Sequence, residues 1–180
     1  MMERCVLILD FDGVITSLNI DWRRVREEVS RRVGFKVKSI IAFWEKYFGT
    51  ELFNVANGIV EKYELEAVLN SKPYLDVKQA LEWFKGTTYL ASMQSERAIS
   101  LFLDTYDLKK YFKEALSRNA FKSKIEQIRY VLDKEKWREK FILIDDSKRN
   151  VVSCQQPGLI CFHLKRKTGN ELKEVLKQLL

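Results

Sequence analysis

The sequence predicts an α/β protein, in which a Rossmann-like parallel sheet core with helices on both faces carries a small all-α helical-bundle cap domain. Two observations lead to this fold class. From about residue 72 onward, short apolar runs alternate with amphipathic segments, a pattern typical of parallel sheets covered on both faces. Residues 16–71, in contrast, have helical spacing throughout. We therefore expect residues 1–15 and 72–180 to form the core and residues 16–71 to be the inserted cap.

The first element is the apolar run from Leu7 to Leu9, which we expect to be a buried strand. It stops at two carboxylates one residue apart, Asp10 and Asp12, and Gly13 follows directly. Two carboxylates this close repel each other, so either one holds a proton or a cation lies between them. Both outcomes suit phosphoryl chemistry.

Three helices are expected in the predicted cap, since apolar residues recur there at spacings of three and four. The apolar sets fall within residues 22–33, 40–48 and 52–67. Gly34 and Gly49 lie between them, where helices commonly stop. Trp22 and Trp44 fit the packing stripes of these helices, although they and Arg23 are also candidates to face a substrate.

The second half of the chain predicts alternating helices and strands. We expect helices over residues 77–84, 98–103 and 172–179 and from residue 123, with strands over residues 87–92, 141–144 and 159–163. Ligands of open parallel sheets bind beyond the carboxyl ends of the strands. One run ends in Ser92 and another in Asp145 and Asp146, so a hydroxyl and two more acids are expected near Asp10 and Asp12.

A lysine is needed to balance these acids and a bound phosphate, and two candidates lie close together. Ser123 and Glu126 have the spacing of a capping box, which would place Lys124 in the first turn of a helix. A cation there opposes the helix dipole, and this is easier to explain if Lys124 faces an anion. Lys122 is the other candidate.

Charge and composition restrict the class of protein. The hydrophobic fraction of 46% and the length of 180 residues suit one core with a small insert. The formal net charge of +7 would attract nucleic acid or small anions, but it lies in clusters typical of solvated faces. We expect nucleic acid not to be the partner.

No apolar run is long enough to span a bilayer, and the first residues lack the features of a secretory signal. The three cysteines are odd in number and lie in apolar contexts, which fits a reducing compartment. We therefore expect a cytoplasmic protein that does not bind membranes and is a monomer or homodimer.

The acidic and hydroxyl motifs together resemble those of the haloacid dehalogenase superfamily, specifically its phosphatase branch, over the whole chain. The segment from Asp10 to Val14 is similar to the first motif, Ser92 to the second, Lys124 or Lys122 to the third, and the Asp145-Asp146 pair to the fourth. The helical insert resembles the cap that many members carry just after the first motif.

The resemblance implies a phosphate monoester hydrolase that acts on a small phosphorylated metabolite through an aspartyl-phosphate. Asp10 would be the nucleophile and Asp12 the general acid and base, with Lys124 completing the catalytic group. The metal ligands of the implied Mg²⁺ would be Asp10, the backbone carbonyl of Asp12, Asp146, and Asp145 through water. The groups implied to bind the phosphate are Ser92, Met93, Lys122 or Lys124, and the backbone near Phe11.

Two other functions remain open on the sequence, and it argues against a third. A phosphomutase of the same superfamily would use the same residues, and an inactive relative could have become a basic nucleic-acid-binding protein. A receiver domain also gathers acids, a hydroxyl and a lysine around Mg²⁺, but the order of the motifs argues against it. Asn150 departs from the family pattern, since many members have an acid there, and Asp145 would compensate for it.

Overall fold

The computed structural model describes residues 2–180, and its centre is a five-stranded sheet. The strand order is β3-β2-β1-β4-β5, and every neighbouring pair is parallel. The strands are β1 (Cys5–Leu9), β2 (Thr87–Ala91), β3 (Glu114–Leu116), β4 (Lys140–Asp145) and β5 (Leu159–His163). The predicted parallel α/β core is therefore confirmed.

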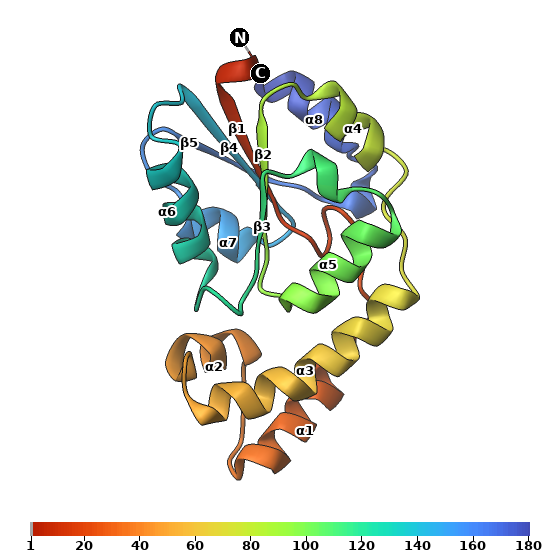
Figure 1. Cartoon of the computed structure of the whole chain (residues 1–180), viewed down its shortest axis with the longest axis vertical. Helices are drawn as coiled ribbons and strands as arrows, with labels where there is room; N and C mark the ends of the chain where they lie inside the picture. The colour runs from red at the N-terminus through yellow and green to blue at the C-terminus, as the bar shows by residue number, and fades with distance from the viewer. Residues whose placement is uncertain (1) are drawn as a thin grey trace.

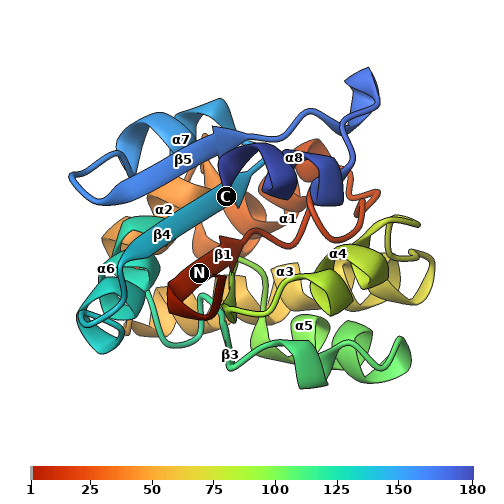
Figure 2. The same ribbon diagram turned by 90° about the horizontal axis from the view of Figure 1, so that it is seen from above.

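Helices cover both faces of this sheet (Figure 2). One face is covered by α4 (Val77–Trp83), α5 (Glu96–Thr105) and α8 (Leu172–Leu179), and the other by α6 (Lys124–Lys134) and α7 (Lys148–Ser153). Successive strand residues point to opposite faces, so Leu7 and Leu9 of β1 pack with the first group of helices. Val6 and Ile8 pack on the other face with α6. Both faces of β1 are thus buried, as its unbroken apolar sequence predicts.

The three predicted helices of the insert are α1 (Trp22–Val33), α2 (Ile40–Tyr47) and α3 (Glu51–Leu69). Together they are called the helical unit, and they lie beyond the carboxyl ends of the strands (Figure 1). Side chains of Asp21, Ser39 and Thr50 accept backbone N–H groups at the first turns of these helices. Gly34 ends α1 in the left-handed conformation, with φ of 83°. The helical unit has its own apolar cluster, in which Trp44 is buried.

Two segments join the helical unit to the sheet, and they run side by side where Thr16 forms an antiparallel bridge with Pro73. The Thr16 hydroxyl also donates to the carbonyl oxygen of Lys72 at 2.8 Å. The predicted boundary of the cap, residues 16–71, falls at these segments. However, Ala67 and Val68 at the end of α3 pack in the core cluster of the sheet, so α3 belongs to both bodies. The division into two domains stays a prediction.

Two elements of the core have no counterpart in the sequence prediction. The strand β3 has three residues and the helix α7 has six, so neither is long enough to show a periodic apolar pattern. Among residues 2–180, no helix is both long enough and apolar enough to cross a membrane.

Candidate active site

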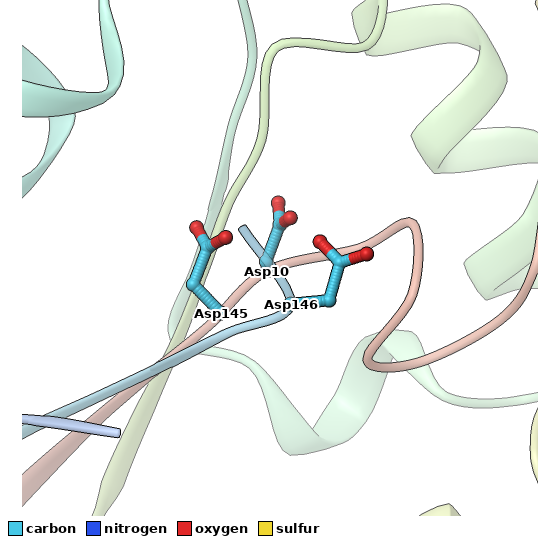
Figure 3. Close-up of side chains that lie close together, drawn as sticks. All are labelled: Asp10, Asp145 and Asp146. Atoms are coloured by element: carbon cyan, nitrogen blue, oxygen red, sulfur yellow. The ribbon is translucent and has the colours of Figure 1, made fainter. Parts of the chain in front are cut away.

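Three carboxylates meet where β1 and β4 end. Asp10 directly follows β1 and Asp145 is the last residue of β4, and the two strands are neighbours in register. With Asp146, they bring one oxygen each to within 4.8 Å of one another (Figure 3). Asp10 and Asp145 are buried, whereas Asp146 is exposed to solvent. The structure therefore brings the first and the last acidic motifs of the sequence to one point.

Lys124 lies between two of these acids. Its Nζ is 2.6 Å from Oδ1 of Asp10 and 3.3 Å from Oδ2 of Asp145, and it also donates to the carbonyl oxygen of Ala91. Burial alone lowers the pKa of Lys124, but the two carboxylates outweigh this and raise it above its ordinary value. The ammonium group is thus charged, and its charge offsets part of the repulsion between the acids.

Local helix capping determines which of the two predicted lysines reaches the site. The Ser123 side chain accepts the backbone N–H of Glu126 at 3.3 Å, so α6 begins at Lys124 and this side chain points to the sheet edge. The Glu126 carboxylate accepts the N–H of Lys122, not that of Ser123, so only half of the expected capping box forms. Lys122 is exposed and pairs with Glu126 at 3.0 Å, outside the acidic site.

Burial also changes the pKa of the two acids in the first motif. It raises the pKa of Asp10, and the neighbouring Asp145 adds to this while Lys124 opposes it. It raises the pKa of Asp12 to about 6, against the effect of the Leu18 N–H, which donates to Asp12 Oδ1 at 2.8 Å. A carboxyl group with a pKa near neutrality can both donate and accept a proton.

Asp145 is held by a fixed set of donors. The Ser147 N–H donates to its Oδ1 at 2.8 Å, and Asn150 Nδ2 lies 3.2 and 3.1 Å from its two oxygens. The departure from the family pattern at Asn150 therefore has a structural consequence, since an amide donor holds Asp145 where an acid would repel it.

Gly13 allows the loop after β1 to approach Asp146. Its φ is +80°, and a Cβ atom built there would lie 2.1 Å from Oδ2 of Asp146. A side chain at this position would be strained and would also displace the carboxylate. The glycine after the first acidic motif thus keeps the two motifs close together.

The loop after β2 forms another wall of the site. Ser92 is fully buried, its N–H donates to the Leu116 carbonyl at 3.0 Å, and its hydroxyl donates to Gln94 Oε1. Gln127 Nε2 donates to the Ser92 carbonyl at 2.7 Å. The sequence prediction missed Gln127, although it lies three residues after Lys124 and therefore on the same face of α6.

Two predicted phosphate-binding residues can contribute only in a restricted way. The Phe11 ring is buried in the core, with its centroid 5.1 Å from that of Phe102, so its side chain cannot face a ligand. Its carbonyl accepts the N–H groups of Ile15 and Thr16 at 2.9 and 3.2 Å. Met93 borders the cavity, and its carbonyl accepts a hydrogen bond from Arg118 at 3.0 Å.

A buried ion pair joins α3 of the helical unit to the loop after β3, and the sequence prediction missed it. The side chains of Arg118 and Glu64 are 0% and 1% exposed, and their closest N and O atoms are 2.5 Å apart. Arg118 Nε also donates to Asn57 at 2.7 Å, and Glu64 accepts the Ser95 N–H at 3.0 Å. Neither residue lies in a sequence motif, since the charges are far apart in the chain and meet only in the fold.

A cavity of about 510 Å³ lies between these acids and the helical unit. The residues that line it include Asp10, Asp12, Trp22, Arg26, Lys38, Ile41, Trp44, Met93, Gln94, Lys124, Asp146 and Arg149. Trp44 is nearly fully buried and packs in the helical unit as expected, yet its edge borders the cavity with Trp22. The prediction that Arg23 could face a substrate is wrong, because Arg23 is exposed outside this lining.

Comparison with known proteins identifies the fold. No family model and no curated protein matches the chain. A crystal structure described as a predicted phosphoglycolate phosphatase from Haemophilus somnus matches with a TM-score of 0.66 and 13% identity, over 100% of this chain and 99% of that one. A HAD-superfamily hydrolase of subfamily IA from Geobacter sulfurreducens matches with a TM-score of 0.59 and 13% identity, over 97% and 96%.

A haloacid dehalogenase-like hydrolase from Streptococcus pneumoniae matches with a TM-score of 0.62 and 12% identity, over 97% of this chain and 98% of that one. The chain has the haloacid dehalogenase fold. The resemblance stated from the sequence is therefore confirmed at the level of the fold. In each of these pairs the match covers almost the whole length of both chains.

Proposed function

We propose that this protein is a Mg²⁺-dependent phosphate monoester hydrolase that acts on a small phosphorylated metabolite through an aspartyl-phosphate at Asp10. The observation that carries the proposal is the position of Asp10, whose carboxylate is 2.6 Å from the Lys124 ammonium and adjoins Asp145 and Asp146. A nucleophile of this kind needs nearby positive charge to approach an anionic phosphate. Similar structures named as phosphatases support the same class of reaction.

The donor set fits a hard divalent cation. The three nearby side chains offer only carboxylate oxygens, which Mg²⁺ prefers, and Lys124 alone does not offset their charge. The residues that would hold the ion are Asp10, Asp146 and the backbone carbonyl of Asp12, with Asp145 acting through water. When bound, Mg²⁺ would neutralise charge on the phosphoryl oxygens and orient the phosphate.

The chemistry of the protein residues follows from their positions. An oxygen of Asp10 forms a bond to phosphorus while the bond from phosphorus to the ester oxygen breaks, and Asp12 gives its proton to the departing alcohol. Asp12, now a carboxylate, then takes a proton from water, whose oxygen attacks phosphorus and releases phosphate from Asp10. The pKa of about 6 at Asp12 suits both proton transfers.

The test is hydrolysis of p-nitrophenyl phosphate by the full chain, with and without Mg²⁺. We expect Mg²⁺-dependent release of phosphate, and loss of that release in Asp10→Asn, which keeps the size of the side chain but removes the nucleophile. Activity without a divalent ion, or undiminished activity in Asp10→Asn, would refute the proposal. Release of free phosphate from metabolites also distinguishes the hydrolase from a phosphomutase, which would move the phosphoryl group to a second hydroxyl.

A further inference from the structure

The cavity is lined by three carboxylates and Lys124 at the sheet edge, and by two cations and the acid Glu45 on the side of the helical unit. The acidic end is the sheet edge, with Asp10, Asp12 and Asp146. On the side of the helical unit, α1 contributes Arg26, the segment before α2 contributes Lys38, and α2 contributes Glu45. Arg149 comes from α7 of the core. Positive charge therefore exceeds negative charge on the side of the helical unit.

Arg26 and Lys38 are not held in ion pairs in the part of the chain that the structure describes. Within residues 2–180, no carboxylate oxygen lies within 4.0 Å of the Arg26 or Lys38 side chain. Arg149 has only a distant, solvent-exposed partner, Glu45, at 3.9 Å. Two unpaired cations at a cavity wall create a positive potential there and favour binding of an anion.

We infer that the substrate is a phosphate monoester that carries a second anionic group, a carboxylate or a second phosphate, which Arg26 and Lys38 bind. This inference rests on the proposed function. The cavity of about 510 Å³ extends from the acidic edge to these two cations, so its residues can contact a molecule at both ends. Trp22 and Ile41 border the cavity on the same side and offer apolar surface to the carbon atoms between the two anions.

The position of the cations favours a second anion over the reacting phosphate as their ligand. The reacting phosphate must lie at Asp10, where Lys124 of the core is 2.6 Å away. Arg26 and Lys38 belong instead to the helical unit. The guanidinium group of Arg26 can donate two parallel hydrogen bonds, which matches both a carboxylate and a phosphate.

The experiment compares pairs of substrates that differ in one anionic group. Values of kcat/KM are measured with Mg²⁺ for phosphoglycerate against glycerol phosphate, which tests a carboxylate, and for glucose bisphosphate against glucose phosphate, which tests a second phosphate. We expect the wild type to prefer the more anionic member of at least one pair by about tenfold or more. In Arg26→Gln and in Lys38→Gln, we expect this preference to fall by about tenfold, mainly through KM.

Matched control variants remove the same charge nearby. Arg23→Gln lies on the same helix as Arg26, and Lys36→Gln lies two residues before Lys38, but neither residue lines the cavity. Both controls should keep the wild-type preference. An equal preference for both members of both pairs in the wild type would overturn the inference. So would an equal loss on all substrates in Arg26→Gln, because the cation would then serve the reacting phosphate.

Failure of the proposed function would look different. In that case no ester would be hydrolysed, p-nitrophenyl phosphate included, and the inference would fall with the function on which it rests.

Discussion

Among residues 2–180, Lys124 is the only lysine or arginine whose charged group lies within 4.0 Å of the carboxylate oxygens of Asp10 and Asp145. Because the lysine side chain is 6% exposed, solvent screens these ion pairs only weakly. The same ammonium group lies beside the oxygen that would attack phosphorus. Its charge therefore serves two purposes, the ionisation of Asp10 and the approach of an anionic substrate.

Replacing this lysine tests which of the two candidate lysines acts. We expect Lys124→Met to lower kcat/KM for p-nitrophenyl phosphate by about 100- to 1000-fold, because no other lysine or arginine among residues 2–180 forms an ion pair with Asp10. Lys122→Met removes the same charge two residues away, where the side chain is exposed, and should change kcat/KM less than about twofold. Equal losses in both variants, each with an unchanged circular dichroism spectrum, would contradict the assignment of Lys124.

Gly13→Ala tests whether the close approach of the two acidic motifs is needed. The new Cβ would lie 2.1 Å from Asp146 Oδ2, so the carboxylate must move, and we expect activity to fall by about 100-fold or more. The control is Gly34→Ala, where φ is +83° but no atom lies within 4 Å of the new Cβ. It should cost about 1–2 kcal/mol of unfolding free energy from backbone strain and leave activity unchanged. Full activity in Gly13→Ala would contradict the argument.

The acids of this site could be predicted from the sequence, whereas most of their supporting residues could not. Asp10 and Asp145 each end an unbroken apolar run, and strand geometry then dictates that they meet. Arg118 and Glu64 follow no periodic pattern, since their interaction depends on how α3 packs against the loops of the core. The choice between Lys122 and Lys124 also needed the structure, because the sequence places both beside the same cap.

The helix α3 connects the two bodies of the protein. Its first turns pack in the helical unit, and its last turn packs in the core. Nineteen residues give it a length of roughly 28 Å, enough to reach from one body to the other. The Arg118–Glu64 pair fixes α3 at the loop after β3, so a change in this contact should affect the orientation of the helical unit over the cavity.

Removal of one partner of this ion pair should be costly. We expect Arg118→Met to lower the unfolding free energy by about 3–5 kcal/mol, since the Glu64 carboxylate would stay buried without its cation. The matched control is Glu61→Gln, which breaks a second ion pair between α3 and α5 in which Arg97 is 74% exposed. That change should cost about 0–1 kcal/mol. Urea unfolding followed by fluorescence measures both values.

A double variant makes this prediction stricter. Glu64→Gln in the Arg118→Met background removes the unpaired charge, so the loss for the double variant should be smaller than the sum of the two single losses. Additive losses would show that the two side chains do not interact as the structure indicates.

The two bodies together create a cavity whose acidic end has too little positive charge of its own. The cluster of Asp10, Asp145 and Asp146 is partly buried, and Lys124 supplies one positive charge to it. Repulsion among the acids must therefore lower the stability of the folded chain when no divalent ion is bound. Stability and metal binding are thus coupled, which provides a test of the metal site that does not depend on catalysis.

Addition of Mg²⁺ should raise the melting temperature of the protein, and removal with EDTA should reverse this. At about 100 times the dissociation constant, binding to the folded state alone adds about 2.7 kcal/mol, which corresponds to an increase of about 5–10 °C for a chain of this size. Asp146→Asn should reduce this increase strongly, whereas Asp133→Asn, at an exposed position of α6 away from the site, should keep it. An increase that is the same in both variants would place the ion elsewhere and would remove the basis for a metal at Asp10.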